Sequence, residues 1–170
     1  MNPRGRASRT VSAATLPTVV VLGSNSVQAD NESEKEFVGA WTTIHTLPFP
    51  PGSFREFLSL ADGGAVHETN SFLHTSSYLD LRPLGIQRAG VNASDGIGSW
   101  DRVGKGQIRV TFRKFLFDEF AANFGDVRVT GNLRTDGVKL WADWHIDLVT
   151  TENVVLKDLG KATSEGTRIG

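Results

Sequence analysis

The stretch VKLWADWHIDLVT at residues 138–150 decides the fold. Apolar and polar side chains alternate along it with a period of two, the pattern of a β-strand with one buried face. The apolar face comprises Leu140, Ala142, Trp144, Ile146 and Leu148. A turn with Asp136-Gly137 separates this stretch from another alternating run at 126–135. Two alternating runs flanking such a turn indicate antiparallel strands.

Short alternating runs fill most of the chain from Glu36 onward, and no long stretch keeps a helical period. The expected strands are 37–47, 54–61, 65–73, 98–101, 107–118, 126–135, 138–150, 154–162 and 166–169, with a turn at 123–125. Residues 75–96 are less regular and are expected to form a long loop with one poorly patterned strand or a short helical turn. The sequence RKFLF at 113–117 breaks the alternation, so we expect the strand to bend, bulge or lose pairing there.

About eight to ten strands with short sequential connections predict an all-β fold, an antiparallel up-and-down β-barrel. Such a barrel closes on itself and leaves no open sheet edge. A sandwich of two sheets is the structural alternative. A length of 170 residues with 39% hydrophobic and 22% charged residues fits one globular domain.

Residues 1–29 have the order of a secretory signal peptide. Arg4, Arg6 and Arg9 precede an apolar stretch at 16–22, and Ala29 provides a small residue before a cleavage point. The apolar stretch is too short to span a membrane. We expect a removable leader and a single domain over 30–170, secreted or periplasmic; a disordered leader on a cytoplasmic protein is the alternative.

Composition argues against several classes of partner. Without the leader, 15 basic and 19 acidic residues remain and form no basic stripe, so we expect neither nucleic acid nor anionic lipid as a partner. The chain has no cysteine, and its four histidines lie in no metal-ligand motif. No phosphate-binding loop or dinucleotide fingerprint occurs. We therefore expect no metal and no cofactor.

Gly39-Ala40-Trp41 in the first expected strand and Arg168 in the last resemble the lipocalin or wider calycin pattern. In that pattern the indole closes the barrel floor and the guanidinium packs across its face, a cation–π contact. A second Gly-x-Trp, at 98–100, resembles small bacterial lipocalin-like proteins of unassigned function. The resemblance implies a cup with one mouth that holds a small hydrophobic molecule, for which an eight-stranded barrel is wide enough. The chain departs from secreted animal lipocalins by having no cysteine and no obvious long helix before the last strand.

Counting by twos from Trp41 turns His45 inward, and counting from Val66 turns Glu68 and Asn70 inward. The apolar wall of the same cavity is expected to include Phe72, Phe112 and Trp144. A buried carboxylate beside a histidine is a candidate general base. These residues therefore fit either a carrier of a small hydrophobic molecule or a cofactor-free isomerase, cyclase or lyase.

Two other interpretations stay open. Glu68 and Asn70 can hydrogen-bond each other, or arginine residues, in a purely structural polar layer. A filled barrel can also serve as a surface interaction domain, because the same fold hosts unrelated functions.

Overall fold

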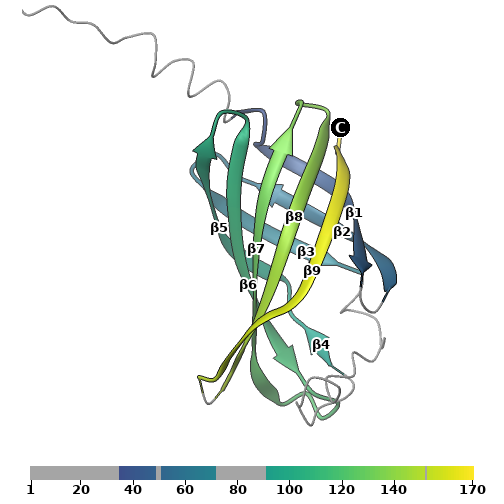
Figure 1. Cartoon of the computed structure of the whole chain (residues 1–170), viewed down its shortest axis with the longest axis vertical. Coiled ribbons are helices and arrows are strands. Elements are labelled where there is room, and N and C mark those ends of the chain that lie inside the picture. The colour runs from purple at the N-terminus through teal and green to yellow at the C-terminus, as the bar shows by residue number, and fades with distance from the viewer. Residues whose placement is uncertain (1–34, 49–50, 72–90, 152) are drawn as a thin grey trace, which may run out of the picture.

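The computed structural model describes residues 35–48, 51–71, 91–151 and 153–170, and Figure 1 shows their arrangement. The expected leader, most of the irregular stretch after Ser71, and Phe72 lie outside the described residues. Nine strands occur in the described part: β1 Gly39–Pro48, β2 Pro51–Leu60, β3 Ala65–Asn70, β4 Asn92–Ala93, β5 Gly96–Gly104, β6 Gln107–Phe117, β7 Asn123–Thr135, β8 Lys139–Thr150 and β9 Val155–Arg168. No helix long and apolar enough to cross a membrane is found among these residues.

The strands form one closed antiparallel barrel. Eight of them pair in the cyclic order β1-β2-β3-β5-β6-β7-β8-β9, and β1 pairs with β9 to complete the circle. The short β4 pairs with the end of β6 and extends the sheet outside this circle. The predicted all-β, up-and-down barrel is confirmed, and the alternative of two separate sheets is wrong.

The strand limits differ most from the prediction at β9 and before β7; β2 also begins earlier than the expected 54–61, and β5 spans Gly96–Gly104 where only 98–101 was expected. The expected strands 154–162 and 166–169 are one strand, β9, because the polar residues between them also pair with β1 and β8. Residues 123–125 begin β7 and are not a turn. The turn precedes them: the side chain of Asp118 accepts hydrogen bonds from the backbone N–H groups of Phe120 and Ala122, and Ala121 has a φ of 60°.

The stretch 113–117 keeps its pairing with β7, with a register shift only between Leu116 and Phe117. The expected irregularity is therefore confined to the last residue of β6. Lys114 points inward with Leu116, while Phe115 points outward and is 62% exposed. The side chains of this stretch still alternate between the inner and outer faces. The apolar and polar residue types do not follow that alternation, because a lysine is inside and a phenylalanine is outside.

One end of the barrel is closed by Trp41, which is fully buried. The guanidinium carbon of Arg168 lies 4.5 Å from the centroid of the indole ring. Arg168 also donates hydrogen bonds to the backbone carbonyls of Val38 and Gly137, and the indole N–H of Trp41 donates to Phe37 O at 2.8 Å. The predicted stacking of Arg168 on a buried Trp41 is confirmed.

The interior contains two groups of buried apolar side chains. The larger surrounds Trp41 and extends along the barrel to Phe112 and Trp144. The smaller lies toward the opposite end and includes Leu116, Phe124 and Leu148. Polar and ionisable side chains are buried alongside these groups.

Candidate functional site

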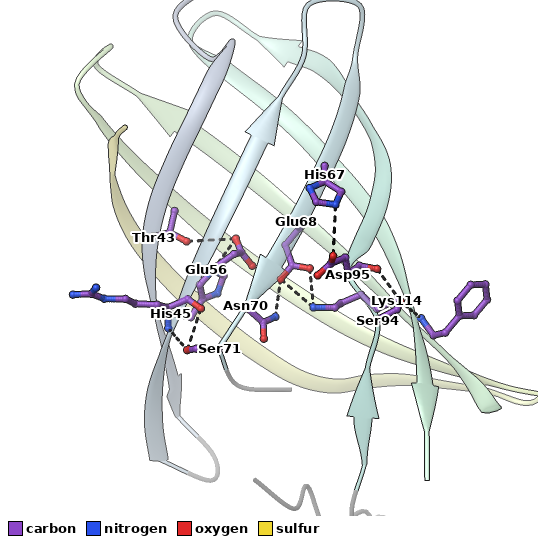
Figure 2. Close-up of polar contacts among 12 residues, drawn as sticks. Thr43, His45, Glu56, His67, Glu68, Asn70, Ser71, Ser94, Asp95 and Lys114 are labelled. Atoms are coloured by element: carbon purple, nitrogen blue, oxygen red, sulfur yellow. Dashed lines mark hydrogen bonds and ion pairs between the residues drawn. The ribbon is translucent and has the colours of Figure 1, made fainter. Parts of the chain in front are cut away.

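Four ionisable side chains from four different strands are buried inside the barrel. They are His45 of β1, Glu56 of β2, Glu68 of β3 and Lys114 of β6, with 3%, 2%, 0% and 3% of their surface exposed. Together with the partly buried Asn70 we call them the polar layer (Figure 2). Each points inward because it shares the period-two face of a buried apolar residue on its own strand.

Glu68 and Lys114 form a buried ion pair. Lys114 Nζ lies 2.8 Å from Glu68 Oε2 and donates a hydrogen bond to Glu68 Oε1 at 3.1 Å. The amide of Asn70 donates a second hydrogen bond to Oε1 at 2.6 Å. Glu68 is therefore held by a cation from another strand and by an amide two residues further along its own strand.

The pair depends on a glycine between the two strands. Strand β5 separates β3 from β6, and Gly96 of β5 lies opposite Glu68 in the register. A Cβ atom at this position would stand 2.7 Å from Glu68 Oε2 and 2.7 Å from the ring of Phe112. The missing side chain leaves room for the Glu68 carboxylate, which meets the Lys114 ammonium across β5.

His45 and Glu56 form the second contact of the polar layer. His45 Nε2 lies 3.0 Å from Glu56 Oε1, and the hydroxyl of Thr43 donates to the same oxygen at 3.4 Å. The imidazole stacks on Phe54, with ring centroids 4.6 Å apart, and lies 5.5 Å from Trp144. Aromatic rings thus contact the imidazole beside a buried carboxylate.

Two buried polar atoms of the layer lack a well-aligned hydrogen bond to any described residue. They are His45 Nε2 and Glu68 Oε2. His45 Nε2 lies 3.0 Å from Glu56 Oε1 and Glu68 Oε2 lies 2.8 Å from Lys114 Nζ, but both contacts are outside hydrogen-bond geometry. Such atoms are uncommon in protein interiors because desolvation is then only partly compensated.

Burial raises the pKa of the Glu68 carboxyl to about 7, and the nearby negative charge of Glu56 acts in the same direction. The Lys114 ammonium and the hydrogen bonds from Lys114 and Asn70 oppose this rise without cancelling it. A carboxyl group with this pKa exchanges protons near neutral pH, which is the property a general acid or base requires.

The structure brings the predicted site residues His45, Glu68 and Asn70 to the interior, as the alternation indicates. Phe112 and Trp144 are buried with them, their rings meeting edge to face at 5.8 Å. The hydrogen bond between Asn70 and Glu68 also agrees with the structural alternative, although lysine and not arginine supplies the charge.

Sequence reasoning missed two members of the layer, Glu56 and Lys114. Glu56 shares its face with Leu58 and Leu60, so the alternation of β2 contains the signal for its burial. Lys114 shares its face with Phe112 and Leu116. Both are charged residues at positions where the period demands an inward side chain.

In the described part of the chain, no three His, Asp or Glu side chains are placed to hold one metal ion. Comparisons with models of protein families, with curated proteins and with solved structures found no match for this chain.

Proposed function

We propose that the barrel binds a small, largely hydrophobic molecule that turns one polar group toward the polar layer. The observation that carries this proposal is a set of four buried ionisable side chains beside aromatic rings, with His45 Nε2 and Glu68 Oε2 incompletely hydrogen-bonded. Burying such groups costs free energy, and perturbed ionisable groups cluster at functional sites. A ligand with a polar end would offset part of that cost.

The shape of the fold supports the same proposal. Closed barrels of eight strands include both barrels filled by side chains and barrels that hold one small ligand. Trp41 and Arg168 close one end, as in the lipocalin-like cup that the sequence resembles. Phe54, which pairs with His45, and Asn70, which pairs with Glu56, are only partly buried, unlike Trp41 at the closed end. A ligand that enters from the end opposite Trp41 would displace these two partly buried side chains.

A second candidate function is a cofactor-free isomerase, cyclase or lyase acting on such a molecule. The rise of the Glu68 pKa to about 7 favours this candidate, because a base of that pKa is effective near neutral pH. In this scheme Glu68 removes a proton from the substrate, while His45 and Asn70 orient its polar group.

Native mass spectrometry of the protein purified from its own host tests the binding proposal. We expect a mass above that of the bare chain, lost when the protein is denatured. The binding proposal would be refuted if the spectrum shows only the bare chain and if an organic extract of the host does not raise the melting temperature.

The variant Glu68→Gln then separates carrier from enzyme, because it keeps the shape of the side chain and removes its basicity. A carrier should keep most of its affinity, whereas an enzyme should lose turnover by roughly 10²-fold or more while still binding. Glu165→Gln is the matched control, since Glu165 is exposed on β9.

We also propose that the domain acts outside the cytoplasm, in a secreted or periplasmic form. The support is the order of three arginines, an apolar stretch and Ala29 at the start of the chain. N-terminal sequencing of the mature protein from its host should begin near Asp30. A mature chain that starts at Met1 would contradict export.

A further inference from the structure

The formal charges of the polar layer do not balance when His45 is neutral. Among the described residues, Glu56 and Glu68 contribute two carboxylates to the layer and Lys114 contributes one ammonium. The low dielectric of a protein interior makes an uncompensated charge costly. The layer therefore favours the uptake of one additional positive charge, either as a proton or as a cation.

We infer that the polar group of the ligand is a protonated amine, which supplies this missing charge to the polar layer. The inference rests on the proposed function and specifies its ligand class. An ammonium group has three donors and no acceptor. It therefore matches a layer that already contains two carboxylates, whereas a carboxylate ligand would add a third negative charge beside Glu56 and Glu68.

The aromatic rings next to the layer fit the same ligand. Phe54 and Trp144 flank His45, and Phe112 meets Trp144 edge to face. Aromatic faces attract organic cations and also bury apolar groups. A short amine with a hydrophobic body therefore matches both the charge and the walls of this part of the barrel.

A proton is the competitor of the amine. Two ionisable groups face Glu68, namely Glu56 from β2 and Lys114 from β6, and His45 of β1 lies beside Glu56. The other close neighbours of Glu68 are Asn70 and Gly96 of β5, which are uncharged. In the free protein Glu68 holds a proton below pH 7, because burial and Glu56 raise its pKa. A bound cation would displace that proton, so amine binding should tighten as pH rises.

Octylamine, 1-octanol and octanoate form a suitable set of probes, because they share one hydrocarbon chain and differ in charge. Isothermal titration calorimetry at pH 8 of the protein as purified from its host should show octylamine binding roughly tenfold or more tighter than octanol, with octanoate weakest. Between pH 6 and pH 8 the affinity for octylamine should rise roughly tenfold, following the ionised fraction of a group with a pKa near 7. Octanol binding should change little over that range.

Glu56→Gln removes the surplus negative charge and keeps the Glu68–Lys114 pair. We expect it to abolish the preference for octylamine over octanol, and Glu165→Gln on the outer face to leave the preference intact. If octanol or octanoate binds the wild type as tightly as octylamine, the amine inference is wrong and the proposed binding function stands. If none of the three probes binds, the amine inference is wrong, and native mass spectrometry of the protein from its host decides the binding proposal separately. The wild-type comparison decides the question even if Glu56→Gln fails to fold.

Discussion

Replacing Lys114 by methionine is expected to destabilise the protein in a way that depends on pH. Methionine keeps the length of the side chain and removes the ammonium group that lies 2.8 Å from Glu68 Oε2. At pH 8 the variant loses the stabilisation that the ionised pair provides, because Glu68 must either remain a buried carboxylate near Glu56 with no lysine partner or take up a proton. Breaking one side of a buried ion pair typically costs about 3–5 kcal/mol.

At pH 6 the same substitution should cost less. Without Lys114 the pKa of Glu68 rises further, because the ammonium is the main influence that lowers it. The carboxyl then takes up a proton and becomes neutral, so most of the cost of an unpaired buried charge disappears. Urea unfolding followed by tryptophan fluorescence at the two pH values measures this difference directly.

The double variant Glu68→Gln/Lys114→Met provides the matched control. It removes both charges while keeping the approximate side-chain volumes, and we expect it to recover most of the stability that Lys114→Met loses at pH 8. An equal loss for Lys114→Met at pH 6 and pH 8, with no recovery in the double variant, would show that packing and not charge explains the effect. The electrostatic description of the polar layer would then be refuted.

Three further outcomes follow from the same structure. The free energy of unfolding of the wild type should fall by up to roughly 3 kcal/mol as pH rises from 4.5 to about 7, because the folded-state pKa of Glu68 lies above its ordinary value. In the same titration the free energy of unfolding of Glu68→Gln should depend less on pH. Trp41→Ala should cost about 3–5 kcal/mol in urea unfolding, and a loss under about 1 kcal/mol would contradict its role at the closed end. Gly96→Ala should lower the free energy of unfolding by about 1–3 kcal/mol, because the added methyl group meets Glu68. Gly52→Ala is the control: no heavy atom lies within 4 Å of its added carbon, so its free energy of unfolding should change by less than about 0.5 kcal/mol.

The barrel could be predicted from the sequence because its late strands alternate with little interruption. The apolar face of 138–150 and the Asp-Gly turn before it define two neighbouring strands without any knowledge of distant contacts. The closed end was predicted from the resemblance of Gly39-Ala40-Trp41 and Arg168 to the lipocalin pattern, not from local alternation. Trp41 and Arg168 lie near opposite ends of the domain, and the pairing of β1 with β9 brings them together.

The division of β9 into two expected strands was wrong because inward polar residues resemble a loop. Ser164 occupies an inward position and is buried, and its hydroxyl accepts a hydrogen bond from the indole N–H of Trp144 at 2.9 Å. The partner is 20 residues away in the sequence, so local pattern gives no sign that the serine is satisfied. When an inward polar residue has a hydrogen-bond partner far away in the sequence, a prediction from local pattern therefore places the end of the strand too early.

Lys114 shows the same limitation with a larger consequence. The stretch 113–117 offers two apolar faces, one with Phe115 and one with Leu116, and only the second agrees with the period of 107–112. Following that period places a lysine inside the barrel, which is costly unless an opposite charge is also inside. The period of β3 places Glu68 inside by the same reasoning. The cost of burying either charge is smaller when the opposite charge lies beside it. Inward charges of opposite sign on different strands are therefore best interpreted as paired, but alternation gives Lys114 two candidate partners, Glu56 and Glu68, and only the arrangement of the strands selects Glu68.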